Sequence, residues 1–158
     1  LLPQVCDAVN IPVIGAGGIA DGRGIAAAFT LGASAVQVGT RFLASEECQI
    51  HQNYKNAVVK AKDIDTVVTG RSTGHPVQVI KNKLAKEYLK LENNNVNIEE
   101  LEELGKGALK KAVIDGDIDN GSLMAGQISG MVNKIQSVKE IIEEMFNEYD
   151  NIKCNFNS

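Results

Sequence analysis

Two glycine-containing stretches, residues 15–22 (GAGGIADG) and residues 36–42 (VQVGTRF), indicate the fold of this chain. In each, glycine follows a short apolar run: Gly15 comes after residues 11–14 (IPVI), and Gly39 comes after residues 33–38 (ASAVQV). Short runs rich in β-branched side chains are typical of parallel strands that are buried on both faces. The sequence therefore predicts two buried strands, each ending in a glycine turn.

A helix is expected after each turn. Asp21 is placed as the N-cap of a helix over residues 22–31, and Gly32 as its C-terminal stop. A second, short helix is expected over residues 40–44. The order strand, turn, helix is thus repeated, and both turns lie at the carboxyl ends of their strands, where parallel α/β proteins bind ligands.

The glycine turns suit a phosphate group. Gly17 and Gly18 have no Cβ, so their peptide N–H groups can come close to a ligand that a side chain would hold away. Either turn alone is an ordinary feature of α/β proteins, but the tandem pair, with Thr40 following the second glycine, favours a phosphate site.

The rest of the chain is expected to be mainly helical. Helices are predicted over residues 49–61, 81–91, 98–104, 108–114 and 122–132, and after Ser137, which forms a capping box with Glu140. The helix over residues 122–132 mixes small and apolar residues and is expected to pack against a flat surface. Short strands are predicted at residues 64–69 and 77–79.

Composition narrows the class of protein. The chain has 158 residues and no tryptophan, and its net charge of −4 disfavours a nucleic-acid partner. No apolar stretch reaches the roughly 18 to 20 residues that span a bilayer, and we expect a cytoplasmic protein. Cys6, Cys48 and Cys154 are expected to be free thiols. Because the chain begins without methionine, inside an expected helix, we expect it to be a piece of a longer protein.

Four separated motifs together resemble one family. They are residues 12–22 (PVIGAGGIADG), 32–42 (GASAVQVGTRF), 70–77 (GRSTGHPV) and 124–127 (MAGQ). Their order is similar to that of the nitronate monooxygenase superfamily, and more narrowly to the second half of the flavin-dependent enoyl-[acyl carrier protein] reductases II of bacterial fatty-acid biosynthesis. Several motifs in one order are more specific than a single glycine turn.

The resemblance implies an α/β fold, the C-terminal portion of a (β/α)₈ TIM barrel that carries FMN. Residues 1–48 would form strands seven and eight with their helices, residues 49–149 a helix-rich insert and cap packing on the barrel, and residues 150–158 a loose tail. It implies cofactor-binding roles on two turns, at Ala16, Gly17, Gly18, Gln37, Val38, Gly39 and Thr40. It implies substrate-binding roles at Met124, Ala125, Gly126 and Gln127.

The resemblance also implies an activity. NAD(P)H would reduce FMN, and the reduced flavin would reduce a trans-2-enoyl thioester on an acyl carrier protein. The family's catalytic histidine lies on an upstream segment that this chain lacks, so we expect no activity without the missing half of the barrel, and we expect a homo-oligomer. Gln78 stands where many relatives have arginine. Nitronate monooxygenase and a non-catalytic, associating fragment remain as alternatives.

Four further features have two interpretations each. Arg41 could balance a phosphate or pair with a carboxylate, and the second is the more common. His75 is expected to be a turn residue rather than a catalytic one. The alternating aspartates of residues 115–119 resemble a calcium loop but lack its glutamate, which favours a solvated turn. Met124 could pack in the core or face a flavin.

Overall fold

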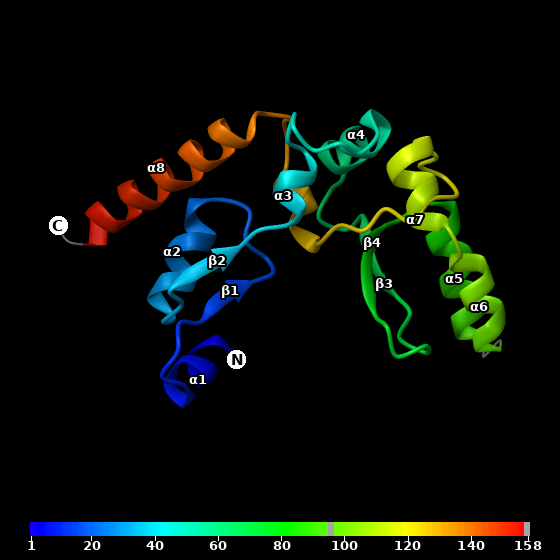
Figure 1. Ribbon diagram of the computed structural model, residues 1–158, viewed down its shortest axis with the longest axis horizontal. Helices are drawn as coiled ribbons and strands as arrows, with labels where there is room; N and C mark the ends of the chain where they lie inside the picture. Colours follow the sequence, from blue (N-terminus) through cyan, green and yellow to red (C-terminus); the bar gives the residue numbers. More distant parts are fainter. Residues whose placement is uncertain (95–96, 157–158) are drawn as a thin grey trace.

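The first part of the chain is a small α/β unit. The computed structural model describes residues 1–94 and 97–156, and it begins with α1 (Leu2–Ala8), β1 (Ile14–Ala16), α2 (Gly22–Thr30), β2 (Ala35–Gln37) and α3 (Thr40–Leu43). The strands β1 and β2 pair in parallel, with Ile14 opposite Ala35 and Ala16 opposite Gln37. Because the two strands end side by side, the two glycine turns lie at the same edge of the sheet (Figure 1).

The signals that delimit α2 act as predicted. The Asp21 carboxylate accepts hydrogen bonds from the N–H groups of Arg23 (3.0 Å) and Gly24 (3.2 Å). Gly32 follows the helix at φ +97°, a conformation that is open to glycine and strained for other residues. Ile25 and Ala28 then pack against Ile141 of the last helix, α8 (Val138–Phe156), to form the core of this unit.

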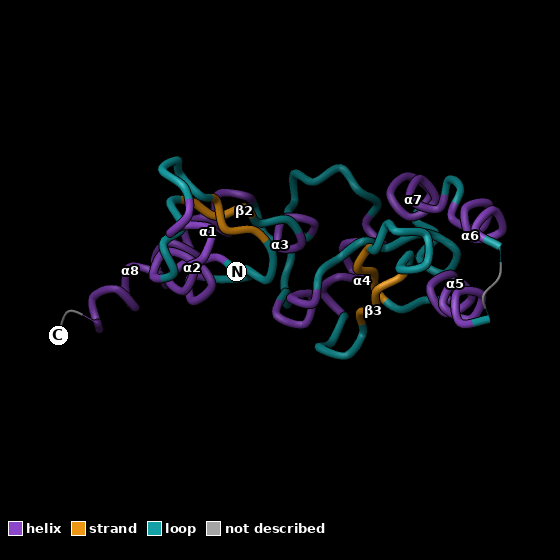
Figure 2. The backbone as a smooth tube through the Cα atoms, turned by 90° about the horizontal axis from the view of Figure 1, so that it is seen from below, coloured by secondary structure: helices purple, strands orange, loops and turns teal. Residues whose placement is uncertain are grey.

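The second part combines a β-hairpin with helices. The strands β3 (Thr66–Thr69) and β4 (Val77–Ile80) pair antiparallel. The helices are α4 (Gln52–Lys60), α5 (Lys83–Asn93), α6 (Ile98–Gly105) and α7 (Ala108–Lys110), with a π-helical turn, η1 (Lys111–Asp115), continuing α7. A 3₁₀ helix, η2 (Gln127–Met131), precedes α8. The two parts lie towards opposite ends of an elongated molecule, with α3 between them (Figure 1, Figure 2).

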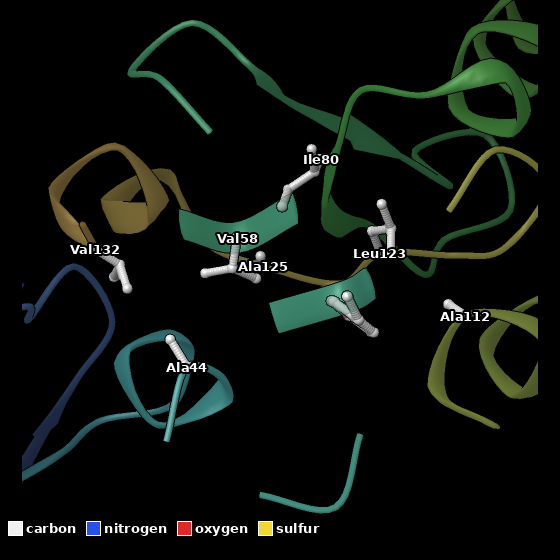
Figure 3. Packing of buried hydrophobic residues seen from close by; sticks show 8 residues of the cluster. Ala44, Val58, Ile80, Ala112, Leu123, Ala125 and Val132 are labelled. Carbon is white, nitrogen blue, oxygen red and sulfur yellow. The ribbon is translucent and has the colours of Figure 1, made fainter. Parts of the chain in front are cut away.

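A second hydrophobic core holds this part together. Val58 of α4, Ile80 of β4 and Leu123 of the segment before η2 are all buried in it, and Ala44 brings the end of α3 to the same cluster (Figure 3). Since this core receives residues from α3 as well as from the hairpin, it fixes the position of the second glycine turn relative to the hairpin.

The last helix begins as predicted and ends later than predicted. The Ser137 hydroxyl accepts a hydrogen bond from the Glu140 N–H (3.2 Å), and the Glu140 carboxylate accepts one from the Ser137 N–H (2.9 Å), which is a capping box. The tail expected to be loose from residue 150 is helical up to Phe156, and residues 157–158 lie outside the described part.

Two predictions about elements are wrong. The first strand begins at Ile14 rather than at residue 11, and Ile14 is 60% exposed, because β2 is its only strand neighbour among the described residues. Residues 122–132 do not form one helix. The part up to Ala125 is extended and lies beside β4, where Leu123 accepts a hydrogen bond from the Ile80 N–H (2.9 Å).

The fold is therefore α/β, as predicted, with a parallel pair and an antiparallel pair of strands. The barrel to which β1 and β2 would contribute remains a prediction. Among the described helices, none combines the length and the apolar character needed to cross a bilayer. The described cysteines are free thiols.

Candidate functional site

The first glycine turn is an open stretch of backbone at the end of β1. Gly17 and Gly18 adopt φ +94° and φ +73°, which L-residues rarely adopt. A Cβ added to either glycine would meet no atom within 4 Å, so the space above the turn is free. The turn can therefore bring peptide groups directly against a ligand.

The second turn lies beside it, after β2. A Cβ on Gly39 would also meet no atom within 4 Å. The N–H groups of Gly18 and Gly39 donate no hydrogen bond to any described residue, which leaves two backbone donors available at this edge of the sheet. Such donors are the usual partners of phosphate oxygens.

Thr40 connects this edge to the second part of the molecule. Its hydroxyl oxygen accepts a hydrogen bond of 2.9 Å from the Gly126 N–H, across 86 positions of sequence. Because the oxygen acts as acceptor towards Gly126, its hydroxyl hydrogen is free to donate to a ligand. The structure thus brings together Thr40 and Gly126, which the sequence assigned to cofactor and substrate respectively.

The segment that carries Gly126 is held from two sides. Ala125 donates its N–H to the Gln78 carbonyl (3.1 Å), and the Tyr54 hydroxyl donates to the Met124 carbonyl (2.8 Å). Burial raises the pKa of Tyr54, so this phenol stays a hydrogen-bond donor at physiological pH. The Ala125 side chain is buried in the core, whereas Met124 is 39% exposed and available to a ligand.

Charge near the first turn is locally compensated. Burial acts to raise the pKa of Asp21, but hydrogen bonds from Arg23 and Gly24 outweigh it and hold this pKa below its ordinary value. Arg23 pairs with this carboxylate and lies 3.6 Å from a Glu148 oxygen. The carboxylate that caps α2 therefore repels an anion at the neighbouring turn less than a free one would.

Arg41 forms no salt bridge with a described carboxylate, and its predicted contact with a phosphate stays a prediction. It is buried, and its guanidinium donates to the Gln136 side-chain oxygen and to the Lys134 carbonyl (3.5 Å). Burial lowers the pKa of Arg41, although the nearby Glu144 acts in the opposite direction. No sequence signal pointed to Gln136, because it lies 95 positions from Arg41.

The remaining candidates have structural roles. The Asp117 carboxylate accepts hydrogen bonds from the N–H groups of Asp119 (3.1 Å) and Asn120 (2.9 Å), which makes the aspartate loop a turn. No group of side chains suited to a metal ion occurs within residues 1–94 and 97–156. His75 donates its backbone N–H to the Gly70 carbonyl (3.0 Å), as expected of a turn residue. His51, which the sequence did not single out, caps α4.

The two turns fit the phosphate group of a cofactor. They offer free backbone donors, a free hydroxyl hydrogen and open space beside the glycines. The predicted roles of Ala16, Gln37 and Val38 beside these donors stay predictions.

Comparison with known proteins places the chain in a family. The family model of nitronate monooxygenase matches residues 1–148. A protein of Staphylococcus saprophyticus described as a probable nitronate monooxygenase is 36% identical over 152 residues, and one of Bacillus subtilis with the same description is 35% identical over 148 residues. These matches cover 96% and 94% of this chain.

Two solved structures have the same fold over nearly the whole chain. FabK from Thermotoga maritima matches with a TM-score of 0.94 and 47% identity, covering 99% of this chain. A nitroalkane oxidase from Streptomyces ansochromogenes matches with a TM-score of 0.79 and 30% identity, also covering 99% of this chain.

The chain is shorter than these relatives. It spans 42% of the Staphylococcus protein, 50% of the Thermotoga chain and 44% of the Streptomyces chain. The matched portion includes both glycine turns and the segment that carries Gly126. With the family model covering residues 1–148, the chain belongs to the nitronate monooxygenase family of flavin-dependent oxidoreductases.

Proposed function

We propose that this chain supplies the FMN-phosphate side of an NAD(P)H-dependent enoyl-[acyl carrier protein] reductase. The observation that carries the proposal is the hydrogen bond between Thr40 and Gly126. It joins the second glycine turn to the segment that carries the exposed Met124. The higher identity to FabK, 47% against 30% for the nitroalkane oxidase, supports the reductase over the oxidase.

Each residue has a defined task in this proposal. The N–H groups of Gly18 and Gly39 bind phosphate oxygens, and the Thr40 hydroxyl donates a third hydrogen bond. Gly126 has no side chain to come between its backbone and a flat ring system, and Met124, which is 39% exposed, contacts the substrate. When bound, FMN supplies hydride transfer to the enoyl thioester, and the protein supplies placement and exclusion of water.

The proposal includes partners that lie outside this chain. The substrate is carried by an acyl carrier protein, the reductant is NAD(P)H, and the catalytic histidine comes from the upstream half of the barrel. A homo-oligomer in the cytoplasm is part of the same proposal. Gln78, in place of the arginine of many relatives, donates to the Thr66 hydroxyl (2.9 Å) and is proposed to alter the preference for nucleotide or carrier.

Nitronate oxidation is the second candidate. It is favoured by the two curated relatives at 35–36% identity, both described as probable nitronate monooxygenases. Both reactions use the same phosphate turns, so the turns cannot separate them. Paired assays on the flavin-loaded protein, assembled with the upstream half of a related reductase, separate them directly: enoyl-thioester-dependent oxidation of NAD(P)H supports the reductase, and oxygen consumption with a nitronate supports the oxidase.

Flavin titration tests the phosphate site. Quenching of FMN fluorescence is measured with the natural chain, with Gly18→Val and with Gly74→Val. Both glycines have positive φ and open space around them, so the two variants carry the same kind of backbone strain, but Gly74 lies in the hairpin loop. We expect Gly18→Val to abolish binding and Gly74→Val to preserve it.

The same titration can reject the proposal. If neither this chain alone nor the chain mixed with the upstream half of a related reductase binds FMN, the flavin role is wrong and the associating fragment is the better description. Equal loss of binding in Gly18→Val and Gly74→Val would show a general effect on folding. Riboflavin, which lacks the phosphate, is expected to bind much more weakly than FMN.

A further inference from the structure

A cavity of about 270 Å³ lies between the hairpin and the helices that follow it. Apolar side chains of the lining come from Val77 and Val79 of β4, from Leu84 of α5, and from Leu109 and Met124. Polar residues also contribute to the lining: Thr69, Thr73, His75, Asn82, Tyr88, Glu102 and Ser122. Figure 1 shows this region, with α5, α6 and α7 lying beside β3 and β4. The volume is close to the lower end of the roughly 300–1,000 Å³ range of small-molecule sites.

The chemistry of the walls favours a hydrocarbon. Asn82, a polar residue of the wall, already uses its side chain: it donates to the carbonyls of Ile118 (2.8 Å) and Gly121 (2.7 Å) and accepts from the Ala85 N–H (2.9 Å). Among the described residues, no buried side-chain nitrogen or oxygen lacks a partner. Glu102 and His75 also line the cavity, but both residues are exposed, so neither provides a buried counter-charge for a charged ligand.

One short segment connects the cavity to the phosphate turn. Met124 lines the cavity, and two positions later Gly126 donates its N–H to Thr40. At the rise of an extended chain, two residues span about 7 Å. A substrate that contacts Met124, as proposed above, therefore lies at the wall of this cavity.

We propose that this cavity binds the aliphatic tail of the acyl substrate and sets the preferred chain length. The proposal rests on the function proposed above, which supplies a substrate with such a tail. It places the tail between β4 and α5, and it assigns the room for the tail to the absence of a side chain at Gly105, the last residue of α6.

Gly105 offers a direct way to close the cavity. It lines the wall, it is the last residue of α6, and a Cβ added there would find Tyr88 Cε2 at 4.0 Å as its nearest neighbour. A leucine at this position can project into the cavity without displacing backbone. Since glycine is a poor helix former, Gly105→Leu is also expected to fold.

The test is calorimetric binding of saturated acyl-pantetheines with 4, 8 and 12 carbons, together with unacylated pantetheine. Each methylene that enters the cavity is expected to tighten binding about fourfold, until the cavity is full. Gly105→Leu should remove the dependence on chain length. The matched control, Glu100→Leu, adds the same side chain to an exposed position of α6 outside the cavity and should retain it.

Two results would overturn the proposal. One is an affinity that does not change between 4 and 12 carbons, or that is equal in the natural chain and in Gly105→Leu. The other is equally tight binding of unacylated pantetheine that Gly105→Leu abolishes, which would assign the cavity to the pantetheine arm instead.

Failure of the cavity proposal can be told apart from failure of the proposed function. The calorimetry uses no flavin, whereas the proposed function depends on the FMN titration and on enoyl-thioester reduction. If FMN binds and reduction occurs but Gly105→Leu changes nothing, only the position of the tail is wrong. If no FMN binds, the reductase proposal fails whatever the calorimetry shows.

Discussion

Two glutamates, Glu140 and Glu92, each have a pKa that is lowered by hydrogen bonds from a serine. Each pair can serve as the control for the other. The Glu140 carboxylate accepts from the Ser137 N–H (2.9 Å) and hydroxyl (2.8 Å), which lowers the pKa of Glu140. Glu92 accepts from the Ser72 N–H (3.0 Å) and hydroxyl (2.9 Å). Burial raises the pKa of Glu92, but the hydrogen bonds from Ser72 and its neighbours outweigh it, so this pKa is lowered too.

We predict that Ser137→Ala raises the pKa of Glu140 towards its ordinary value and leaves that of Glu92 unchanged, and that Ser72→Ala does the reverse. Carboxyl chemical shifts in an NMR pH titration give both values. Because the pKa is lowered in the folded state, the interaction stabilises the protein above the ordinary glutamate pKa of about 4.3 and is lost as the pH falls below it. A shift of both glutamates in either variant would contradict the pairing.

The hydroxyl of Thr40 is expected to contribute to stability as well as to ligand binding. Thr40→Val keeps the shape of the side chain but leaves the Gly126 N–H without its acceptor, and we predict a loss of about 1 kcal/mol in the free energy of unfolding. Thr40→Ser keeps the hydroxyl and should lose less. Urea denaturation of the two variants measures the difference, and equal stability of Val and Ser would show that the bond contributes nothing.

At the scale of elements, the contact between α2 and α8 depends on the absence of a side chain at Gly22. A Cβ there would lie 2.5 Å from both the Met145 carbonyl oxygen and the Tyr149 nitrogen, which are backbone atoms of α8. We predict that Gly22→Ala lowers the free energy of unfolding by about 1–3 kcal/mol, since the helices must separate to admit the methyl group.

Gly105→Ala is the matched control for this prediction. It makes the same change near a helix end where the added methyl group has room, and it should be neutral or stabilise the chain by up to about 1 kcal/mol. Thermal unfolding of the two variants compares them. If both variants lower the free energy of unfolding equally, the effect comes from the loss of a glycine and not from the contact between α2 and α8.

Elements with local signals could be predicted from the sequence, and those with distant partners could not. Asp21 and Ser137 cap helices through neighbours two or three positions away, so their role is visible in the sequence. The extended conformation before Gly126 depends on the backbone of β4, more than 40 positions earlier, and small apolar residues fit a helix equally well. Its misassignment as a helix follows from that ambiguity.

In the candidate site, too, features with local signals could be predicted and features that depend on distant residues could not. Both glycine turns and Thr40 could be named from the sequence, because they directly follow strands. The bond between Thr40 and Gly126, and the burial of Arg41 against Gln136, depend on the packing of α3 against later segments, which spacing along the chain does not reveal.

At the scale of the whole molecule, apolar side chains are exposed around β1. Ile11 is 72% exposed and Ile14 is 60% exposed, and the face of β1 beside them borders an apolar hollow. Exposed apolar patches of this kind mark surfaces that bind other chains. We predict concentration-dependent association of this chain in sedimentation velocity, weakened by Ile14→Lys.

Ile64→Lys is the control for this surface. Ile64 is 74% exposed but lies between α4 and β3, in the other part of the molecule. The substitution Ile64→Lys should leave the association of the chain unchanged. A chain that stays monomeric at all concentrations, or that responds equally to both substitutions, would show that the β1 face is not the contact.

The last helix, α8, supplies a carboxylate that binds the N-terminal end of α2. Glu148 accepts a hydrogen bond of 2.8 Å from the Gly22 N–H at the start of α2, across 126 positions of sequence. During synthesis on a ribosome, at about 5–20 residues per second, Gly22 emerges several seconds before Glu148 does. For that interval the nascent chain already contains both glycine turns but has no α8 to hold α2 in place. The order of translation therefore delays the completed contact between α2 and α8 until α8 itself has been made.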